Sequence, residues 1–419
     1  MKIKKLLLLA LVFIFLVFCS ARKEPGLKVS RILQNIDISK SPPGVVQLPE
    51  QVPPVIRNIF NRYTRITAPN GKPIHLLAQS GWTEDQILKA RNVLQHLLTD
   101  YPGSVYGNNK TAVANAMADK NAAMVLFNTV ADLEKAFETT PLEKVDLSMQ
   151  DLRANECPAE GTEDYMNHIT RDASFEEIWH LVHDYGVKAT LQEMLTEMRK
   201  ANDAAAKKGW LAWPEDEPQE HPNEYVGVLI DNYLDLWMVR PKKYEGRDIG
   251  PKDVPEGTSH FSRYFANSRE KLRKLDPSGY ALVEKFFQPY LTYNAKLPEN
   301  FAGTFSLTFD KDIVYTYKSQ HLKDVTLRGN NPAHLVGNAW DNKLTGNNGD
   351  NQLAGGAGSD VLNGGNGKDT AIFSGNYNEY TITKENGRIT VTDKKTNRDG
   401  IDVIINIEWL QFQDQRVAL

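Results

Sequence analysis

Four consecutive nine-residue units, GNAWDNKLT, GNNGDNQLA, GGAGSDVLN and GGNGKDTAI, fill residues 337–372 and decide the fold of the C-terminal part of the chain. Each unit begins with glycine, has an acid or amide at its sixth position and an aliphatic residue at its eighth. Glycine permits tight turns with positive φ, and the aliphatic residue gives each unit a short strand facing a narrow core. Because a disordered Gly/Asn linker would not keep so strict a phase, we predict stacked repeats.

The sixth position of each unit carries the chemistry of the repeats. Along the chain it is occupied by Asn342, Asn351, Asp360 and Asp369. The carbonyl oxygens of tight turns converge, and an acid at this place closes the kind of oxygen cage that Ca²⁺ prefers. The residues therefore predict that this segment binds calcium.

These units resemble the RTX, or hemolysin-type, calcium-binding repeats, whose consensus is GGxGxDxUx. The resemblance implies a parallel β-roll at residues 326–372, with calcium between turns two repeats apart. The turn at 337–342 would pair with 355–360, and the turn at 346–351 with 364–369. The implied calcium-site residues are Asn342, Asn351, Gly355, Asp360, Gly364 and Asp369. Since the two earlier turns carry amides, each site has one carboxylate, and we expect the weak affinity of extracellular calcium modules.

The tail behind the repeats resembles the capping segment found in serralysin-type exported metallopeptidases. The similarity rests on AIFSGNYNEYTIT and DGIDVIINIEWLQFQD. It implies a β cap at residues 373–419. The export route of that family is not carried over, because it reads a C-terminal signal and this chain has an N-terminal one.

A second informative stretch, SFEEIWHLVHDY, lies at Ser174–Tyr185. With helical period its apolar residues share one face, and the opposite face holds only acids and histidines. These polar residues are Glu176, Glu177, His180, His183 and Asp184. Such a face can ligate a metal or move protons, and the alternative is an amphipathic helix with an acidic outer face.

The spacing of Glu176, Glu177 and His180 is that of the H-E-x-x-H helix of zincin-type metallopeptidases, with Glu in the first ligand position. Interpreted in this way, Glu176 and His180 are ligands of a transition metal such as Zn²⁺, and Glu177 is the catalytic base that activates water. Gluzincins take a further Glu from a downstream helix, often within Asn-Glu. Glu224, in the apolar segment NEYVGVLID, is therefore the expected third ligand. Glu in place of His lowers the affinity expected for Zn²⁺.

Two other interpretations of this helix remain open. Glu177, His180 and His183 have i, i+3, i+6 spacing and could bind the metal instead, which keeps His183 as a reserve ligand. The motif could also be a relic that preserves the fold without a metal.

The segment at 55–325 resembles an uncharacterised zincin-like bacterial family that bears RDASFEEIWHLVHDYG and NEYVGVLIDNYLDLW. The resemblance implies a zincin-like fold. Helical patterns outnumber strand patterns here, so the fold class is α+β with a mostly helical domain. Helices are expected from Thr83, at 131–137, 174–185, 191–208, 223–239, 268–275 and 280–287. Strands are expected at 122–127, TFSLTF and DIVYTYK, and a loop at 142–171.

The N-terminus has the pattern of an export signal at residues 1–21. Lysines precede the apolar run at 6–18, and small residues precede a cleavage site after Ala21. Leu16-Val17-Phe18-Cys19 resembles a lipobox, so a lipid anchor at the bacterial surface is the alternative to secretion. No later segment reaches the apolar length of a membrane span, which leaves that anchor as the one expected membrane contact. The Pro-rich residues 22–54 are expected to form a linker or arm.

The composition limits the function classes. A chain of 419 residues with 41% hydrophobic residues can bury a sizeable core, and a formal charge of −4 offers no basic field for nucleic acid. Two hypotheses follow. The first is an exported calcium-binding, metal-dependent hydrolase that acts on peptide or protein substrates. The second is a non-enzymatic surface or binding protein that calcium stabilises.

Overall fold

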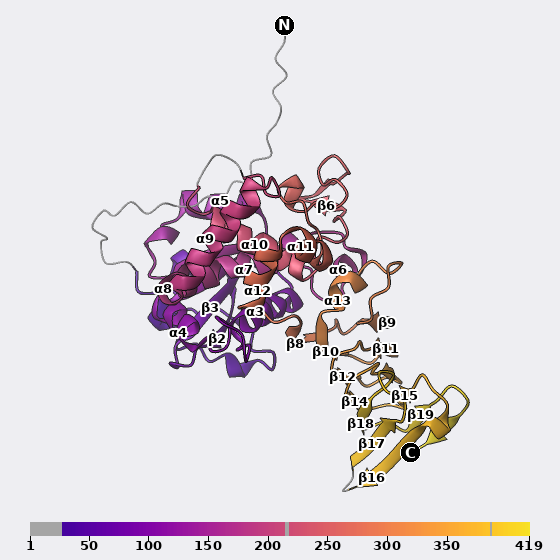
Figure 1. Ribbon diagram of the computed structural model, residues 1–419. Coiled ribbons are helices and arrows are strands. Elements are labelled where there is room, and N and C mark those ends of the chain that lie inside the picture. The colour runs from indigo at the N-terminus through magenta and orange to yellow at the C-terminus, as the bar shows by residue number, and fades with distance from the viewer. Residues whose placement is uncertain (1–26, 214–217, 386–387) are drawn as a thin grey trace.

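The computed structural model describes residues 27–213, 218–385 and 388–419 (Figure 1). The predicted signal at residues 1–21 lies outside the described residues. The fold is mixed α+β, with a helical N-terminal part that contains small sheets and a C-terminal part built from parallel sheets. Within the described part, no helix is long and apolar enough to cross a membrane.

A five-stranded sheet lies at the centre of the N-terminal part, in the order β1-β2-β3-β4-β5. Its strands are β1 (Val46–Gln47), β2 (Arg62–Thr67), β3 (Pro73–Ala78), β4 (Ala122–Phe127) and β5 (Ser148–Arg153). Strand β2 is antiparallel to both β1 and β3, whereas β4 is parallel to both β3 and β5. Successive side chains of a strand point to opposite faces, so both faces of the fully buried strand β4 need a cover.

Helices cover one face of this sheet, and the segment before β2 contributes to the cover of the other. On the helical side, Met124 joins a core with α3 and α7, whereas Val125 faces a second core with Val29 and Ile56. The main helices are α3 (Glu84–Leu98), α4 (Thr111–Asp119), α5 (Val130–Thr139), α6 (Glu163–Asn167), α7 (Ser174–Val182), α9 (Gln192–Lys207), α10 (His221–Tyr233), α11 (Arg269–Leu275) and α12 (Pro277–Glu284). Shorter helices are α1 (Ser30–Leu33), α2 (Pro54–Arg57), α8 (Lys188–Thr190) and α13 (Thr316–Ser319), and β6 (Lys243–Tyr244) pairs with β7 (Arg247–Asp248).

The C-terminal part consists of two facing sheets whose strands alternate along the chain. One has the order β16-β17-β18-β14-β12-β10-β8, and the other β20-β19-β15-β13-β11-β9. The parallel strands are β8 (Leu291–Lys296), β9 (Gly303–Ser306), β10 (Leu322–Thr326), β11 (Ala333–Val336), β12 (Lys343–Thr345), β13 (Gln352–Ala354), β14 (Val361–Asn363), β15 (Thr370–Ile372), β18 (Ile401–Ile405) and β19 (Trp409–Gln411). The antiparallel strands β16 (Tyr380–Glu385), β17 (Arg388–Asp393) and β20 (Arg416–Ala418) lie in the segment expected to form a β cap.

The eighth residues of the repeats form the core between these sheets. Leu344 stands beside Leu362 in one sheet, and Leu353 beside Ala371 in the other. All four side chains are fully buried. This arrangement is consistent with the expected parallel β-roll.

The roll and the helical part share one continuous hydrophobic core. Strand β10 pairs with β8 on one side and with β12, the first repeat strand of its sheet, on the other. The sheet that contains β8, β10 and β12 therefore continues across residue 326, where the composition changes. The roll is joined to the helical part without a linker between them.

Several expected elements are confirmed. Helix α3 begins after Thr83 with a complete capping box to Gln86, and β4 spans 122–127. The predictions for α5, α9, α11 and α12 hold to within a few residues, and α10 ends at Tyr233 rather than at residue 239.

Other expectations were wrong. The segment 142–171 is not all loop, because it contains β5 and α6. DIVYTYK forms no strand and instead leads into α13, where Lys318 is buried with its Nζ 4.0 Å from the ring centre of Tyr165. The helix expected at 174–185 does not end at residue 185: α7 continues through a π-helical turn at His183–Val187. A Cβ at Gly186 would lie 2.6 Å from Cγ1 of Val113, so this glycine admits α4.

Candidate metal centres

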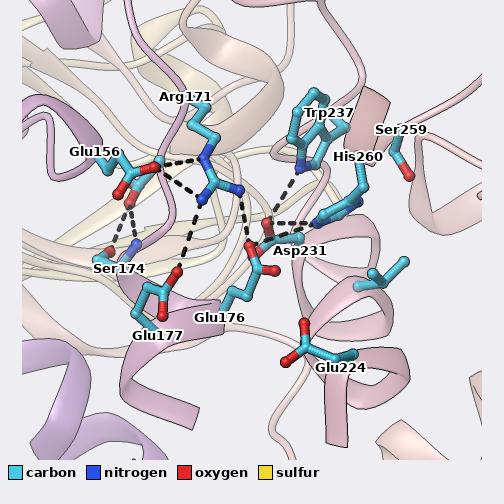
Figure 2. A network of polar contacts seen from close by, with 12 residues as sticks. Glu156, Arg171, Ser174, Glu176, Glu177, Glu224, Asp231, Trp237, Ser259 and His260 are labelled. Carbon is cyan, nitrogen blue, oxygen red and sulfur yellow. Dashed lines mark hydrogen bonds and ion pairs between the residues drawn. The ribbon is translucent and has the colours of Figure 1, made fainter. Parts of the chain in front are cut away.

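Helix α7 is buried on every side, including the face that carries its acids and histidines. Glu176, Glu177 and His180 are each at most 4% exposed. Helix α7 packs against α3, β5 and α10, and Figure 2 shows Glu176 and Glu177 pointing toward Arg171. The alternative of a solvated acidic face is therefore wrong, because the polar face of this amphipathic helix lies in the interior.

Gly227 allows α10 to lie close to α7 at the candidate ligands. A Cβ at this position would lie 3.0 Å from Cγ of Glu176 and 3.7 Å from Cε1 of His180. Glu224 lies one turn earlier on α10, in the first turn of that helix. Because Gly227 has no side chain, the candidate ligands on α7 and α10 can lie close together.

The structure brings Glu176, His180 and Glu224 into one group. One ligand atom from each residue lies within 4.8 Å of the others. Nε2 of His180 lies 3.6 Å from Oε1 of Glu224. A second group of the same kind consists of Glu176, Asp231 and His260.

His183 is not part of either group within the described chain, so the set of Glu177, His180 and His183 is not brought together. Its Nδ1 lies 2.8 Å from Oδ1 of Asp184. Glu177 belongs to neither group, and Nε2 of Gln150 donates to its Oε2 at 3.1 Å.

Arg171 ties the carboxylates of this centre together (Figure 2). Its guanidinium donates to Oε1 of Glu156 at 2.9 and 3.0 Å and to Oε2 of Glu176 at 2.9 Å. It also lies 3.8 Å from Oε1 of Glu177. Glu176 therefore has one oxygen engaged by Arg171, and its other oxygen remains to ligate a cation.

The centre contains more acidic than basic side chains, and this excess shifts the pKa values of several of them. Burial would lower the pKa of His180, but Glu224, Glu177 and Glu176 raise it to about 9. Burial raises the pKa of Glu224, and burial with Glu176 raises that of Asp231. Burial opposes ionisation of Glu176 as well, yet Arg171, His260 and His180 hold its pKa below the usual value. A cation would balance this excess of buried carboxylates.

Asp231 and His260 were not predicted as ligands. Asp231 lies seven residues after Glu224 on α10, and this spacing places both on one face of a helix. Nε2 of His260 lies 3.2 Å from Oδ2 of Asp231 and 3.8 Å from Oε2 of Glu176. His260 lies in a loop without periodic signal, in a run with Phe261 and Ser262 whose φ values are 48°, 54° and 71°. Consecutive left-handed residues are strained and persist where surrounding contacts enforce them.

A small cavity adjoins the first group. Its volume is about 10 Å³, and Glu176, Glu224, His260 and Arg171 line it together with Trp213, Val228, Phe261 and Arg263. A cavity of this size holds about one water molecule or ion. The donor set of carboxylates and imidazole suits a divalent transition metal.

The turns of the roll form a separate centre. Asp360 and Asp369 are fully buried, and the Oδ2 atom of each has no hydrogen-bond donor among the described residues. Oδ1 of Asp360 accepts from the backbone N–H of Asn342 at 2.7 Å, and Oδ1 of Asp369 accepts from that of Asn351 at 2.7 Å. The turns predicted to pair are thus adjacent.

Glycine keeps these carboxylate oxygens open. A Cβ at Gly355 would overlap Oδ2 of Asp360, and a Cβ at Gly364 would overlap Oδ2 of Asp369. Buried carboxylate oxygens without donors, beside glycine turns, fit a calcium ion, which prefers several oxygen ligands.

The class that this architecture defines is a protein with a calcium-binding β-roll joined to a helical α+β part. Residues 336–371 match the RTX calcium-binding nonapeptide repeat in four copies, which confirms the resemblance stated from the sequence and calcium as a ligand of this segment. No curated protein matches the chain.

Proposed function

We propose that the chain is an exported calcium-binding RTX protein whose helical part is a metal-dependent, peptidase-like hydrolase of zincin-like fold. Glu176, His180 and Glu224 hold the transition metal, with Zn²⁺ as the expected ion, and Glu177 is the catalytic base. The observation that carries the proposal is the convergence of one ligand atom from each of the three residues within 4.8 Å.

The surroundings of the three ligands support this assignment. They come from two helices that Gly227 lets approach closely, and the mixed sheet with β5 packs against the same helix α7. A divalent ion at this place would act as a Lewis acid toward water and a substrate carbonyl. Glu177, next to the ligand Glu176, would take the proton from water, and Gln150 orients its carboxylate. Arg171 donates to Oε2 of Glu176, so the other oxygen of this carboxylate would bind the metal.

Calcium binding in the roll is assigned to the paired turns. Asp360, with Asn342 and Gly355, forms one site, and Asp369, with Asn351 and Gly364, forms the other. The open Oδ2 atoms of the two acids support this. Export, either as a secreted protein or with a lipid on Cys19, follows from the N-terminal signal pattern and suits a roll that folds where calcium is abundant.

The experiment is a metal analysis of the purified chain combined with a peptide-cleavage assay. Wild type is expected to carry one tightly bound transition ion and to cleave an unstructured protein such as casein. His180→Ala is expected to lose both the ion and the cleavage, whereas Glu177→Gln keeps the ion and loses cleavage by 100-fold or more, the order expected for a lost general base. His183→Ala is the matched control and is expected to keep the ion. A wild-type chain without a transition ion refutes the proposal.

A second function is favoured by the size of the cavity. At about 10 Å³ it admits an ion or a water but no peptide, and Arg171 occupies one oxygen of Glu176. These features suit a non-enzymatic surface or binding protein in which the buried centre only stabilises the fold. In that case the ion would be present in wild type, and Glu177→Gln would change nothing in the cleavage assay.

A further inference from the structure

Two strands after the repeats continue the parallel ladders of the roll. Strand β14 pairs in parallel with β18, where Val361 stands opposite Val403. Asp360 directly precedes Val361, and Asp402 directly precedes Val403. Asp402 therefore occupies the place of a sixth-position acid, although it lies outside residues 336–371, which match the repeat.

A hydrogen bond that recurs from turn to turn confirms this equivalence. The backbone N–H of Asn342 donates to Oδ1 of Asp360 at 2.7 Å. One level further along the roll, the backbone N–H of Asp360 donates to Oδ1 of Asp402 at 3.1 Å. The segment around Asp402 thus repeats the side-chain contact of a calcium turn, and Gly400 stands two residues before Asp402 as Gly358 stands before Asp360.

The side chains of Asp360 and Asp402 lie on neighbouring levels of the roll, in its interior. They are 0% and 1% exposed, and Oδ1 of Asp402 lies 3.1 Å from the backbone nitrogen of Asp360. Among the described residues neither is paired with a Lys, Arg or His, and Oδ2 of Asp360 has no donor. Two adjacent buried carboxylates repel each other and are costly to keep charged without a cation.

At the turn one level earlier the equivalent side chain is the amide of Asn342, which has its own hydrogen-bond partners. Nδ2 of Asn342 donates to the carbonyl oxygen of Lys323 and to Oδ1 of Asn338, both at 3.1 Å. Oδ1 of Asn342 accepts from the backbone N–H of Asn338 at 2.8 Å. The amide of Asn342 therefore has hydrogen-bond partners for both its oxygen and its nitrogen, whereas the pair of Asp360 and Asp402 leaves Oδ2 of Asp360 without a donor.

The turns on the other side of the roll contain a similar contact between two acidic residues, Asp369 and Glu408. There the backbone N–H of Asp369 donates to Oε2 of Glu408 at 2.7 Å. Glu408 is exposed, so water competes for its carboxylate. The buried pair is the one that requires a ligand.

We propose that Asp360 and Asp402 together bind a calcium ion between the turn at 355–360 and the capping segment. This site lies beyond the repeats and has two carboxylates, whereas each site between repeat turns has one. Because carboxylate count tunes calcium affinity, this site fills at lower calcium concentration than the other two. The cap is then fastened to the roll by the first ion that binds.

The test counts calcium on the purified full chain by equilibrium dialysis, in wild type, Asp402→Asn and Glu385→Gln. Glu385 is an exposed carboxylate of strand β16, so Glu385→Gln controls for the loss of one charge from the cap. Asp402→Asn is expected to bind one calcium ion fewer and to lack the tightest step of the titration. Glu385→Gln is expected to match wild type. An unchanged calcium count in Asp402→Asn overturns the proposal.

A second measurement separates loss of the ion from loss of the fold. In calcium-free buffer Asp402→Asn is expected to resist urea better than wild type, since an amide can donate to Oδ2 of Asp360. Asp402→Ser, which keeps an acceptor for the Asp360 N–H, serves where Asp402→Asn does not fold and must lose the same ion. If both variants unfold at lower urea than wild type without calcium, the acid pair is not the element that calcium relieves.

Discussion

Arg171→Met tests whether Arg171 stabilises the buried centre around α7. The Arg171 side chain is 4% exposed and donates to both Glu156 and Glu176. Methionine keeps much of the volume but leaves Glu176 without its strongest partner, while Glu156 retains Arg153 at 2.6 Å. Breaking a buried pair in this way typically costs about 3–5 kcal/mol, because a charge remains buried without compensation.

The assay is urea unfolding at saturating calcium, so that the roll contributes equally in every variant. Arg247→Met is the matched control: its pair with Asp253 is about one third exposed on both sides, and its loss is expected to cost about 0–1 kcal/mol. Adding Glu176→Gln to Arg171→Met removes the stranded charge and is expected to restore part of the stability. A loss below about 1 kcal/mol in Arg171→Met, or no recovery in the double variant, would refute this account.

Three further predictions concern the roll. Leu353→Ala, at a fully buried core position, is expected to cost about 2–5 kcal/mol in calcium-saturated urea unfolding, whereas Ile401→Ala on the surface changes little. Gly355→Ala pushes a methyl group into Oδ2 of Asp360, so calorimetry is expected to show at least tenfold weaker calcium binding, and unchanged affinity contradicts the site. Burial raises the pKa of Asp360 to about 7, so its contribution to stability without calcium is present below about pH 4 and lost as the pH rises through 7. Calcium-free unfolding midpoints are therefore expected to fall from pH 5 to pH 8, less so in Asp360→Asn; a rise in wild type would contradict the assignment.

Local sequence patterns correctly predicted the elements that capping residues or a continuous apolar run define. Thr83 and Gln86 form the capping box that starts α3, and the apolar run AAMVLF forms β4. The nine-residue phase predicted the strands of the roll and their core because stacking repeats leaves few other arrangements. These features depend on neighbours along the chain or on neighbours one repeat away.

The features that the sequence did not predict depend on distant contacts. DIVYTYK has strand composition, but burial of Lys318 against Tyr165 takes it into α13. The helix expected at 174–185 continues past Tyr185 through the π-helical turn at His183–Val187, where Gly186 lies close to Val113 of α4. Tertiary packing decided both.

The candidate metal centre likewise contains residues that the sequence predicted and residues that it did not. The spacing within α7 and the Asn-Glu pair at the start of α10 were enough to select Glu176, His180 and Glu224, which the structure brings together. His260 reaches the same centre from an irregular loop, and nothing in its sequence surroundings indicates this. Asp231 could have been found from its helical spacing to Glu224.

The pairing of residues 18 apart within each sheet of the roll restricts how its length can change. Leu344 pairs beside Leu362, and Leu353 beside Ala371, so neighbouring nine-residue units lie in opposite sheets. Removing one unit would transfer every later strand, and the cap with them, to the wrong sheet. Removing two adjacent units would shorten the roll and leave all later strands in place. Related chains should therefore gain or lose repeats in pairs, so that their lengths in this segment differ by multiples of 18 residues.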